Sequence, residues 1–449
     1  GGAGVRPHKN SINNYCYPES PEAGIDLFLE KLVQETEKEH EDILEQADET
    51  DAMFGELYSW YLRNPEYRSR VQKLVQSAFA GKPEDIISQS VAKALYGEVS
   101  PYSATRLERF AACAFAHFLQ YGMKLTERVE YEFKPMDMGN VMHEALESFA
   151  EEVRKRGMKW TELTEQERNE IADRCLDNIV ADYGNTVLKS SARNEYMIER
   201  TRRILRRTVW ALQKQLEQGE FQPEGFEVTF GGGRIDRVDI MEDQNKVYVK
   251  VIDYKTGNTS FDLVYLYHGL QLQLMIYLDG ALRVEQKKYP DKEIIPAGVF
   301  YYNIKDPMIQ EKIDADVEAV SAGLMKELKM NGLAQADPEL VYRMDSSLGS
   351  IPVAFNKDGS FRKNSSVADR TQFAVLGRYV RTKIEKIRSS ILEGDAEVSP
   401  YELGKKNACT YCPYMTVCGF DRRLSGYEFR RLKNFSDEEL WKAFDREAE

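Results

Sequence analysis

The stretch Lys246-Val-Tyr-Val-Lys-Val-Ile-Asp253-Tyr-Lys255-Thr-Gly257 decides the fold of this chain. Valine occupies every second position, which predicts a β-strand over 246–255 with one face toward a core. Asp253 and Lys255 continue the alternation, so we expect them on the same face as the valines. A buried carboxylate and ammonium are costly there unless each is paired or binds a metal. A purely structural ion pair is the alternative interpretation of this pattern taken alone.

Two further segments carry residues that can act together with this strand. Gly233-Arg-Ile-Asp236-Arg-Val-Asp239 is expected as the preceding strand, and one of its two acids could face Asp253. Two carboxylates held together repel each other unless a cation such as Mg²⁺ or Mn²⁺ lies between them. Upstream, Gly139 precedes His143 by four residues and permits close approach of a helix to the sheet. A histidine, two aspartates and a lysine can support phosphodiester hydrolysis.

Three of the six cysteines are clustered near the end of the chain. Cys409, Cys412 and Cys418 form C-x2-C-x5-C, a spacing that lets thiolates converge on one ion or cluster. No histidine lies nearby, and Cys113 is the best candidate for a distant fourth ligand. A buried, unliganded Cys113 is the alternative. Spacing alone does not distinguish zinc from an iron–sulfur cluster.

Composition excludes several classes of protein. The chain has 449 residues, 42% of them hydrophobic, and a mean hydropathy of −0.54. This describes a globular protein with a large core rather than a membrane, secreted or disordered one. It begins Gly1-Gly2-Ala3-Gly4 rather than with methionine, so we expect a piece of a longer protein.

Charge is distributed unevenly along the chain. The net charge is −13, yet five arginines fall within Arg200–Arg207. Because electrostatic forces act locally, such a run can bind phosphate on an acidic protein, and a solvated helix face is the alternative. We predict that four of these arginines lie near a DNA path: Arg202, Arg203, Arg206 and Arg207.

Strands mixed with helices predict an α/β or α+β fold with helices layered on a sheet. We expect strands at 226–230, 234–241, 246–255 and 297–303. We expect helices at 104–121, 138–156, 164–182, 193–217, 263–283, 313–331 and 367–393.

The motif order resembles a known family. G-x-x-x-H, G-x-I-D, I-D-Y-K-T-G and Gln273-Leu-Met-Ile-Tyr277 follow one another as in the RecB-family nucleases of the PD-(D/E)XK superfamily. The flanking cysteines resemble its iron–sulfur branch, and most closely the AddB-type subunits of bacterial AddAB helicase–nucleases. The resemblance implies a restriction-endonuclease-like central mixed sheet flanked by helices, with a helical N-terminal segment and an iron–sulfur staple.

The resemblance also implies roles for individual residues. Asp253, Lys255 and Asp236 would be catalytic, with Gln273 and Tyr277 beside the active site. Asp236 is preferred over Asp239 because it directly follows the G-x-I pattern. Ala114 replaces the proline that usually follows the first cysteine, a small departure. The implied ligands of Mg²⁺ or Mn²⁺ are His143, Asp236, Asp253 and the carbonyl of Tyr254. The implied [4Fe–4S] ligands are Cys113, Cys409, Cys412 and Cys418.

The family context adds domains and partners. We expect a helical remnant of a helicase-like region at 1–99, the nuclease domain at 100–425 and a helical tail at 426–449. The expected activity is Mg²⁺-dependent DNA end resection for recombinational repair in the bacterial cytoplasm. The expected partners are single-stranded DNA at a duplex end and an AddA-like subunit, with no membrane. The alternatives are a catalytically silent iron–sulfur module that binds DNA ends, a stand-alone CRISPR-associated nuclease and a zinc-bearing interaction protein.

Overall fold

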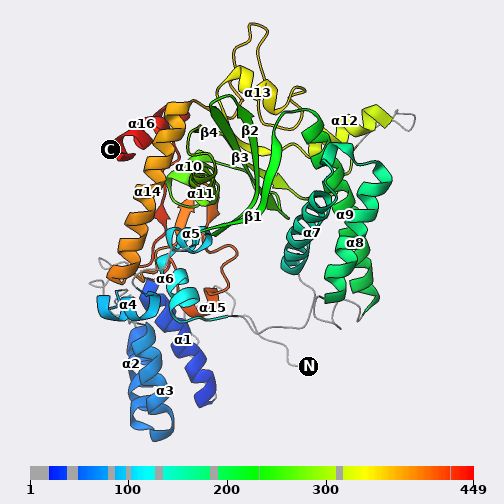
Figure 1. Cartoon of the computed structure of the whole chain (residues 1–449). Coiled ribbons are helices and arrows are strands. Elements are labelled where there is room, and N and C mark those ends of the chain that lie inside the picture. The colour runs from blue at the N-terminus through cyan, green and yellow to red at the C-terminus, as the bar shows by residue number, and fades with distance from the viewer. Residues whose placement is uncertain are drawn as a thin grey trace. The chain divides into compact units, whose positions relative to one another are not determined.

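The computed structural model describes most of the chain, in two compact units (Figure 1). The first unit comprises residues 1–85 and 415–430, and the second comprises residues 86–414 and 431–449. The described residues are 20–37, 49–78, 86–97, 103–126, 135–182, 191–231, 233–309, 317–424 and 426–448.

The N-terminal part of the first unit is helical where it is described, as expected for these residues. Its helices α1 (Pro21–Glu37), α2 (Glu49–Arg63) and α3 (Pro65–Ala78) bury a small aromatic core. Phe28 stacks on Phe54 with ring centroids 4.6 Å apart, and the Tyr61 hydroxyl donates to the Pro21 carbonyl at 2.6 Å. The short helix α15 (Met415–Cys418) also belongs to this unit.

A six-stranded mixed sheet in the order β1-β2-β3-β4-β5-β6 forms the centre of the second unit. Strands β1, β2 and β3 are antiparallel neighbours, β3 and β4 are parallel, and β4 and β5 are antiparallel. The strands are β1 (Gln222–Phe230), β2 (Gly233–Asp243), β3 (Lys246–Lys255), β4 (Glu293–Asn303), β5 (Asn331–Gln335) and β6 (Val367–Ala368).

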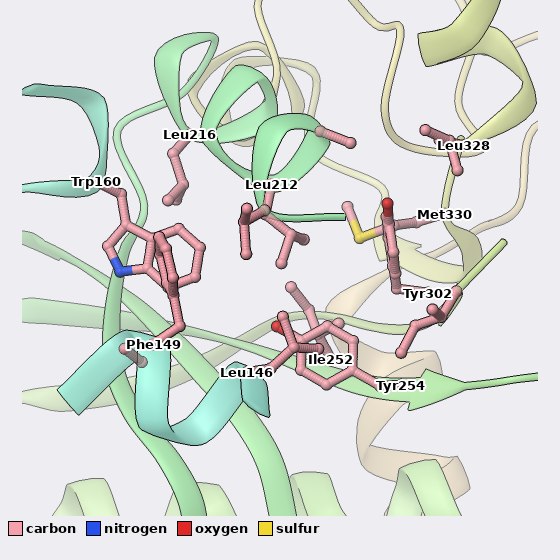
Figure 2. Packing of buried hydrophobic residues seen from close by; sticks show 14 of the residues in the cluster. Leu146, Phe149, Trp160, Leu212, Leu216, Ile252, Tyr254, Tyr302, Leu328 and Met330 are labelled. Carbon is pink, nitrogen blue, oxygen red and sulfur yellow. The ribbon is translucent and has the colours of Figure 1, made fainter. Parts of the chain in front are cut away.

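Three helices cover one face of this sheet: α7 (Pro135–Lys155), α8 (Glu165–Asp182) and α9 (Ala192–Glu217) (Figure 1). Figure 2 shows Leu146 of α7 and Leu212 of α9 packed toward Ile252 and Tyr254 of β3. Even-numbered positions of β3 therefore face these helices. Removing this apolar surface from water stabilises the layer by roughly 25 cal/mol per Å².

The opposite face carries the odd-numbered positions of β3, and Val247, Val249 and Val251 pack there as predicted. The helices over this face are α4 (Gln89–Tyr96), α5 (Ala104–Ala112), α10 (Leu263–Tyr267), α11 (Gln273–Lys288), α14 (Arg370–Glu393) and α16 (Asp437–Ala448).

Two expected helices are interrupted. The helix expected at 263–283 is wrong, because the chain breaks between α10 and α11 at Gly269, whose φ of +79° suits glycine. The helix expected at 104–121 also breaks, at the extended residue Cys113, and continues as α6 (Ala114–His117) and a π-helical turn at Phe118–Gly122. The first break lets α11 begin at Gln273, and the second places α6 in a small cluster with Tyr414.

The remaining elements lie toward the C-terminal part. Helix α14 begins at a capping box formed by Asp369 and Gln372 and ends at Gly394, so the helix expected from residue 367 starts later, after β6. The helix expected at 313–331 is α12 (Val317–Glu327); it ends four residues earlier than expected because β5 begins at Asn331, and residues 313–316 lie outside the described residues. Other described elements are α13 (Pro338–Met344), β7 (Tyr401–Leu403), β8 (Lys406–Asn407) and β9 (Arg430–Arg431). No helix in the described ranges has an apolar stretch long enough to span a bilayer.

Candidate active site

Two aspartates meet at one edge of the sheet. Asp236 lies near the start of β2 and Asp253 near the end of β3, and these strands are antiparallel. Arg237 pairs with Ile252, so the next step of this register places Asp236 opposite Asp253. Only 8% of Asp236 and 1% of Asp253 is exposed. The sequence prediction that an acid of β2 faces Asp253 is therefore consistent with the register.

His143 reaches this pair from helix α7. Its Nδ1 lies 3.4 Å from Asp236 Oδ2 and 3.8 Å from Glu227 Oε1 of β1. Helix α7 thus approaches the sheet as predicted, but glycine is not required for it, because a Cβ on Gly139 would lie at an ordinary contact distance of 3.4 Å from Thr256 Oγ1. A backbone amide holds the Asp236 carboxylate in place, since Tyr254 N donates to Asp236 Oδ2 at 2.7 Å.

The electrostatics of this cluster suit a divalent cation. The ligand atoms of His143, Glu227 and Asp236 all lie within 4.8 Å of one another. We call these three residues, together with Asp253, the metal cluster. Burial raises the pKa of Asp253 to about 7, and the facing Asp236 adds to the rise while Lys255 opposes it. Burial alone would lower the pKa of His143, but Asp236 and Glu227 outweigh it and raise that pKa to about 10. Three carboxylates and one imidazole thus gather at one point, and oxygen ligands with one imidazole fit Mg²⁺ or Mn²⁺.

Lys255 connects the acids to helix α11. Its Nζ lies 2.7 Å from Asp253 Oδ2 and donates to Gln273 Oε1 at 2.7 Å. Gln273 Nε2 in turn donates to the Tyr277 hydroxyl at 2.9 Å. Gln273 and Tyr277 are four residues apart and therefore share one face of α11. The structure thus brings Lys255, Gln273 and Tyr277 into one hydrogen-bonded row beside Asp253.

Glu108 of α5 fixes the start of α11 and was not predicted from the sequence. Its Oε1 accepts from the backbone amides of Leu272 and Gln273 at 2.7 and 3.0 Å. Such amides at a helix N-terminus have no partner within the helix, and a carboxylate is favourable there. Burial nevertheless raises the pKa of Glu108 to about 7. The side chain that positions Gln273, and through it Lys255, therefore comes from a segment far away in sequence.

A pH-dependent stability is expected from Glu108. Its folded-state pKa exceeds its unfolded value, so as pH rises from about 4.5 to 7 the unfolded chain releases its proton first and stability falls. Glu108→Gln should remove this loss, on the order of 2 kcal/mol between pH 5 and 8. Denaturant unfolding of parent and variant at both pH values measures it, with the exposed Glu144→Gln as control. Identical pH dependence in Glu108→Gln and the parent would contradict the assignment.

Asp239 has a different role from Asp236. It accepts from Arg237 Nε at 2.6 Å and lies 2.9 Å from Lys250 Nζ, and all three residues are buried. Burial would raise the pKa of Asp239, but the two cations outweigh it and lower that pKa. Asp239 is therefore held in a structural ion-pair network, which explains the preference for Asp236 at the metal cluster.

Comparison with known proteins identifies the family. The profile of the PD-(D/E)XK nuclease superfamily matches residues 101–419, most of the chain. The chain belongs to this superfamily. The predicted PD-(D/E)XK fold, a mixed sheet flanked by helices, is confirmed, while the iron–sulfur staple stays a prediction. The assignment of Asp236, Asp253 and Lys255 to the catalytic motif also stays a prediction.

Curated relatives are similar along nearly the whole chain. They are B subunits of ATP-dependent helicase/deoxyribonucleases. The protein from Lachnoclostridium phytofermentans is 41% identical over 425 residues, covering 89% of this chain and 36% of the relative. The proteins of the same name from Thermoanaerobacter sp. (strain X514) and Clostridium acetobutylicum are each 33% identical, covering 89% of this chain and 37% and 36% of their own lengths. The chain thus spans a little over a third of these relatives.

Three of the four cysteines predicted as ligands in this PD-(D/E)XK chain belong to the second unit. Cys113 and Cys412 belong to one apolar cluster with Ala116 and Tyr414. Cys409 and Cys412 share a tight turn, in which Cys412 N donates to the Cys409 carbonyl at 3.1 Å. Cys418 lies in α15, which belongs to the first unit. The four-cysteine ligand set stays a prediction.

The predicted arginines contact helix α8 and the segment after β4 rather than the metal cluster. Arg202 Nη2 lies 2.7 Å from Asp177 Oδ1, and Arg206 pairs with Asp173. Arg203 Nε donates to Asp306 at 2.6 Å. The guanidinium of Arg207 lies 5.2 Å from the centre of the Trp210 ring. Their proximity to DNA stays a prediction.

Glu227 is a second residue that sequence reasoning missed. It lies on β1 with a positive φ of 48°, which turns its side chain out of the regular alternation. Besides approaching His143, it forms an ion pair with Arg234. Alternation along β1 could not have indicated it, because the irregular backbone breaks the two-residue period.

Proposed function

We propose that this chain is the nuclease domain of an AddB-like protein and hydrolyses DNA phosphodiester bonds with Mg²⁺. The juxtaposition of His143, Asp236 and Asp253 with Lys255 at one sheet edge carries this proposal. The metal ligands proposed are His143, Asp236, Asp253 and the carbonyl of Tyr254. Glu227 is close enough to His143 and Asp236 to contribute.

A divalent ion at this site would polarise the phosphoryl oxygen and stabilise the charge that develops during hydrolysis. Asp236 is held by the Tyr254 amide, so its carboxylate keeps one orientation. Lys255, anchored by Gln273, presents its ammonium beside Asp253, where it can orient the attacking water and stabilise negative charge. Products with 5′-phosphate and 3′-hydroxyl ends are expected from the resemblance to the superfamily.

A cleavage assay tests the proposal. End-labelled single-stranded DNA should be degraded by the chain in Mg²⁺ and remain intact in EDTA. DNA-end binding without cleavage in Mg²⁺ or Mn²⁺ would instead support a catalytically silent module.

The wider role is inferred from the named relatives. Because their name describes one subunit of a helicase/deoxyribonuclease, we propose an AddA-like helicase–nuclease as the partner in a heterodimer. Such a complex would resect DNA ends during double-strand break repair in the bacterial cytoplasm. We retain 1–99, 100–425 and 426–449 as the proposed helicase-like remnant, nuclease domain and tail.

A [4Fe–4S] cluster on Cys113, Cys409, Cys412 and Cys418 is part of the proposal. Burial raises the pKa of the Cys113 thiol, and Cys412 adds to the rise, so a free thiolate is disfavoured at Cys113. Metal ligation would stabilise such a thiolate. The donor set of four thiolates fits the cluster, which would join segments almost 300 residues apart in sequence.

Replacing one of the four proposed cysteine ligands should show whether the cluster stabilises the fold. Closing so long a loop costs several kcal/mol of chain entropy, so Cys412→Ala should lower both thermal stability and DNA binding. Anaerobic preparations of the parent should be brown, absorb near 400 nm and contain iron, and the variant should lose iron. The matched control is Cys175→Ala, a buried cysteine outside the set. A colourless, zinc-containing parent, or unchanged melting and iron content in Cys412→Ala, would contradict the cluster.

A further inference from the structure

A cavity of about 730 Å³ lies among α8, α9 and α12, away from the metal cluster. Its walls combine two kinds of surface. Val317, Val320 and Leu324 of α12 supply an apolar side, and Trp210 and Tyr196 of α9 supply aromatic rings. The arginines that line it are Arg168, Arg200, Arg202, Arg203, Arg206 and Arg207.

Half of these arginines are neutralised by acids. Arg202, Arg203 and Arg206 pair with Asp177, Asp306 and Asp173, respectively. Within the described residues, Arg200 and Arg207 form no ion pair. Glu165 and Glu199 also line the cavity, and Glu199 shares Arg202 with Asp177. The arginines still outnumber these acids, and Arg200 and Arg207 are left to pair with an anionic occupant.

Arg168 gives independent support for such an occupant. Only 6% of it is exposed, and its Nη1 donates to Gln213 Oε1 at 2.5 Å. Its Nε has no hydrogen-bond partner in the part of the chain that the structure describes. A buried guanidinium with an unsatisfied donor is costly, so a ligand that accepts from it would be stabilised.

The cavity is also linked to the catalytic edge of the sheet. Asn303, the last residue of β4, pairs in register with Lys255. Ile304 N donates to the Lys255 carbonyl at 2.7 Å, and Asp306 then pairs with Arg203. Three residues of chain span at most about 10 Å. The backbone at Asp306, whose side chain pairs with Arg203 at the cavity wall, therefore lies within about 10 Å of Asn303 at the end of β4.

We propose that this cavity binds a nucleotide unit of single-stranded DNA next to the unit being cleaved. Arg200 and Arg207 contact its phosphate, and its base stacks against Trp210. This assignment rests on the proposed nuclease function and adds the site that holds the substrate strand. Phosphate contacts without base-edge recognition suit an enzyme that degrades any sequence.

Binding of fluorescein-labelled oligo(dT) in EDTA, followed by anisotropy across a salt series, tests the site without cleavage. Arg200→Gln combined with Arg207→Gln should weaken binding ~10-fold and lower the salt slope by about 0.7, the contribution of one neutralised phosphate on a single strand. The matched control is Arg193→Gln, an exposed arginine of the same helix outside the cavity. Equal affinity and slope in the double variant and the control would overturn the proposal.

Trp210 supplies a local readout. Oligo(dT) should quench the tryptophan emission of the parent, and Trp210→Phe should lose that quenching because the other tryptophans do not line the cavity. Undiminished quenching in Trp210→Phe would overturn the stacking contact and with it the proposal. Equally tight binding of dTMP alone would assign the cavity to free nucleotides instead and also overturn it.

The same experiments distinguish a failure of the cavity assignment from a failure of the proposed nuclease function. A parent that binds and cleaves oligo(dT) while the double variant does both equally well contradicts only the cavity assignment. A parent that neither binds nor cleaves DNA contradicts the proposed nuclease function.

Discussion

Asp253→Asn should abolish DNA cleavage and remove most of the affinity for Mn²⁺. The carboxylate is buried and faces Asp236 across the two strands. Losing a metal ligand removes the charge stabilisation that the ion supplies, and we expect single-turnover cleavage to fall at least ~10³-fold. Calorimetric Mn²⁺ titration and single-turnover assays measure the two effects.

The variant should nevertheless be as stable as the parent or more stable in EDTA. The pKa of Asp253 is raised to about 7, so above that pH its charge is less favourable in the folded protein than in the unfolded chain. Asn removes that charge. Denaturant unfolding at pH 8 therefore separates lost chemistry from lost folding. The control is Asp291→Asn, an exposed aspartate before β4, which should leave all three measurements unchanged. Cleavage at the parent rate in Asp253→Asn would place the active site elsewhere.

Lys255→Met should slow cleavage by about 10²–10⁴-fold while Mn²⁺ binding is largely retained. Lys255 is paired with Asp253 and held by Gln273, but its ammonium is itself a cation and does not ligate a metal. Slower cleavage with retained Mn²⁺ affinity distinguishes the role of Lys255 from that of the carboxylates, whose loss should lower both. The same calorimetric and single-turnover measurements apply.

Lys246→Met is the matched control, because Lys246 is exposed at the other end of the same strand. It should retain parental rate and affinity. Loss of Mn²⁺ binding in Lys255→Met in proportion to the loss of rate would show that Lys255 acts by maintaining the metal cluster rather than in the chemical step.

Local pattern was sufficient to predict the strands and helices that carry the metal cluster. Alternating valines in β3 indicated both the strand and the face that Asp253 and Lys255 share, because strand side chains alternate strictly. The glycine four residues before His143 predicted the approach of α7 to the sheet, and His143 Nδ1 lies 3.4 Å from Asp236 Oδ2 of β2, although a side chain at Gly139 would also be accommodated. Such features depend on neighbours only a few residues apart.

Contacts between distant segments were decided by the tertiary structure alone. Glu108 holds the start of α11 from more than 160 residues away, and this contact accompanies the break in the helix expected at 263–283. Periodicity continues across Gly269 and therefore did not reveal the break. Glu227 joins His143 only because an irregular backbone turns it toward α7.

The partners of the arginines in α9 likewise depend on the packing of α8. The sequence thus determined which chemistry the chain can carry, since that depends on residue types at fixed local spacing. Only the folded chain determined how the chemistry is oriented, since orientation depends on which distant surfaces are buried together.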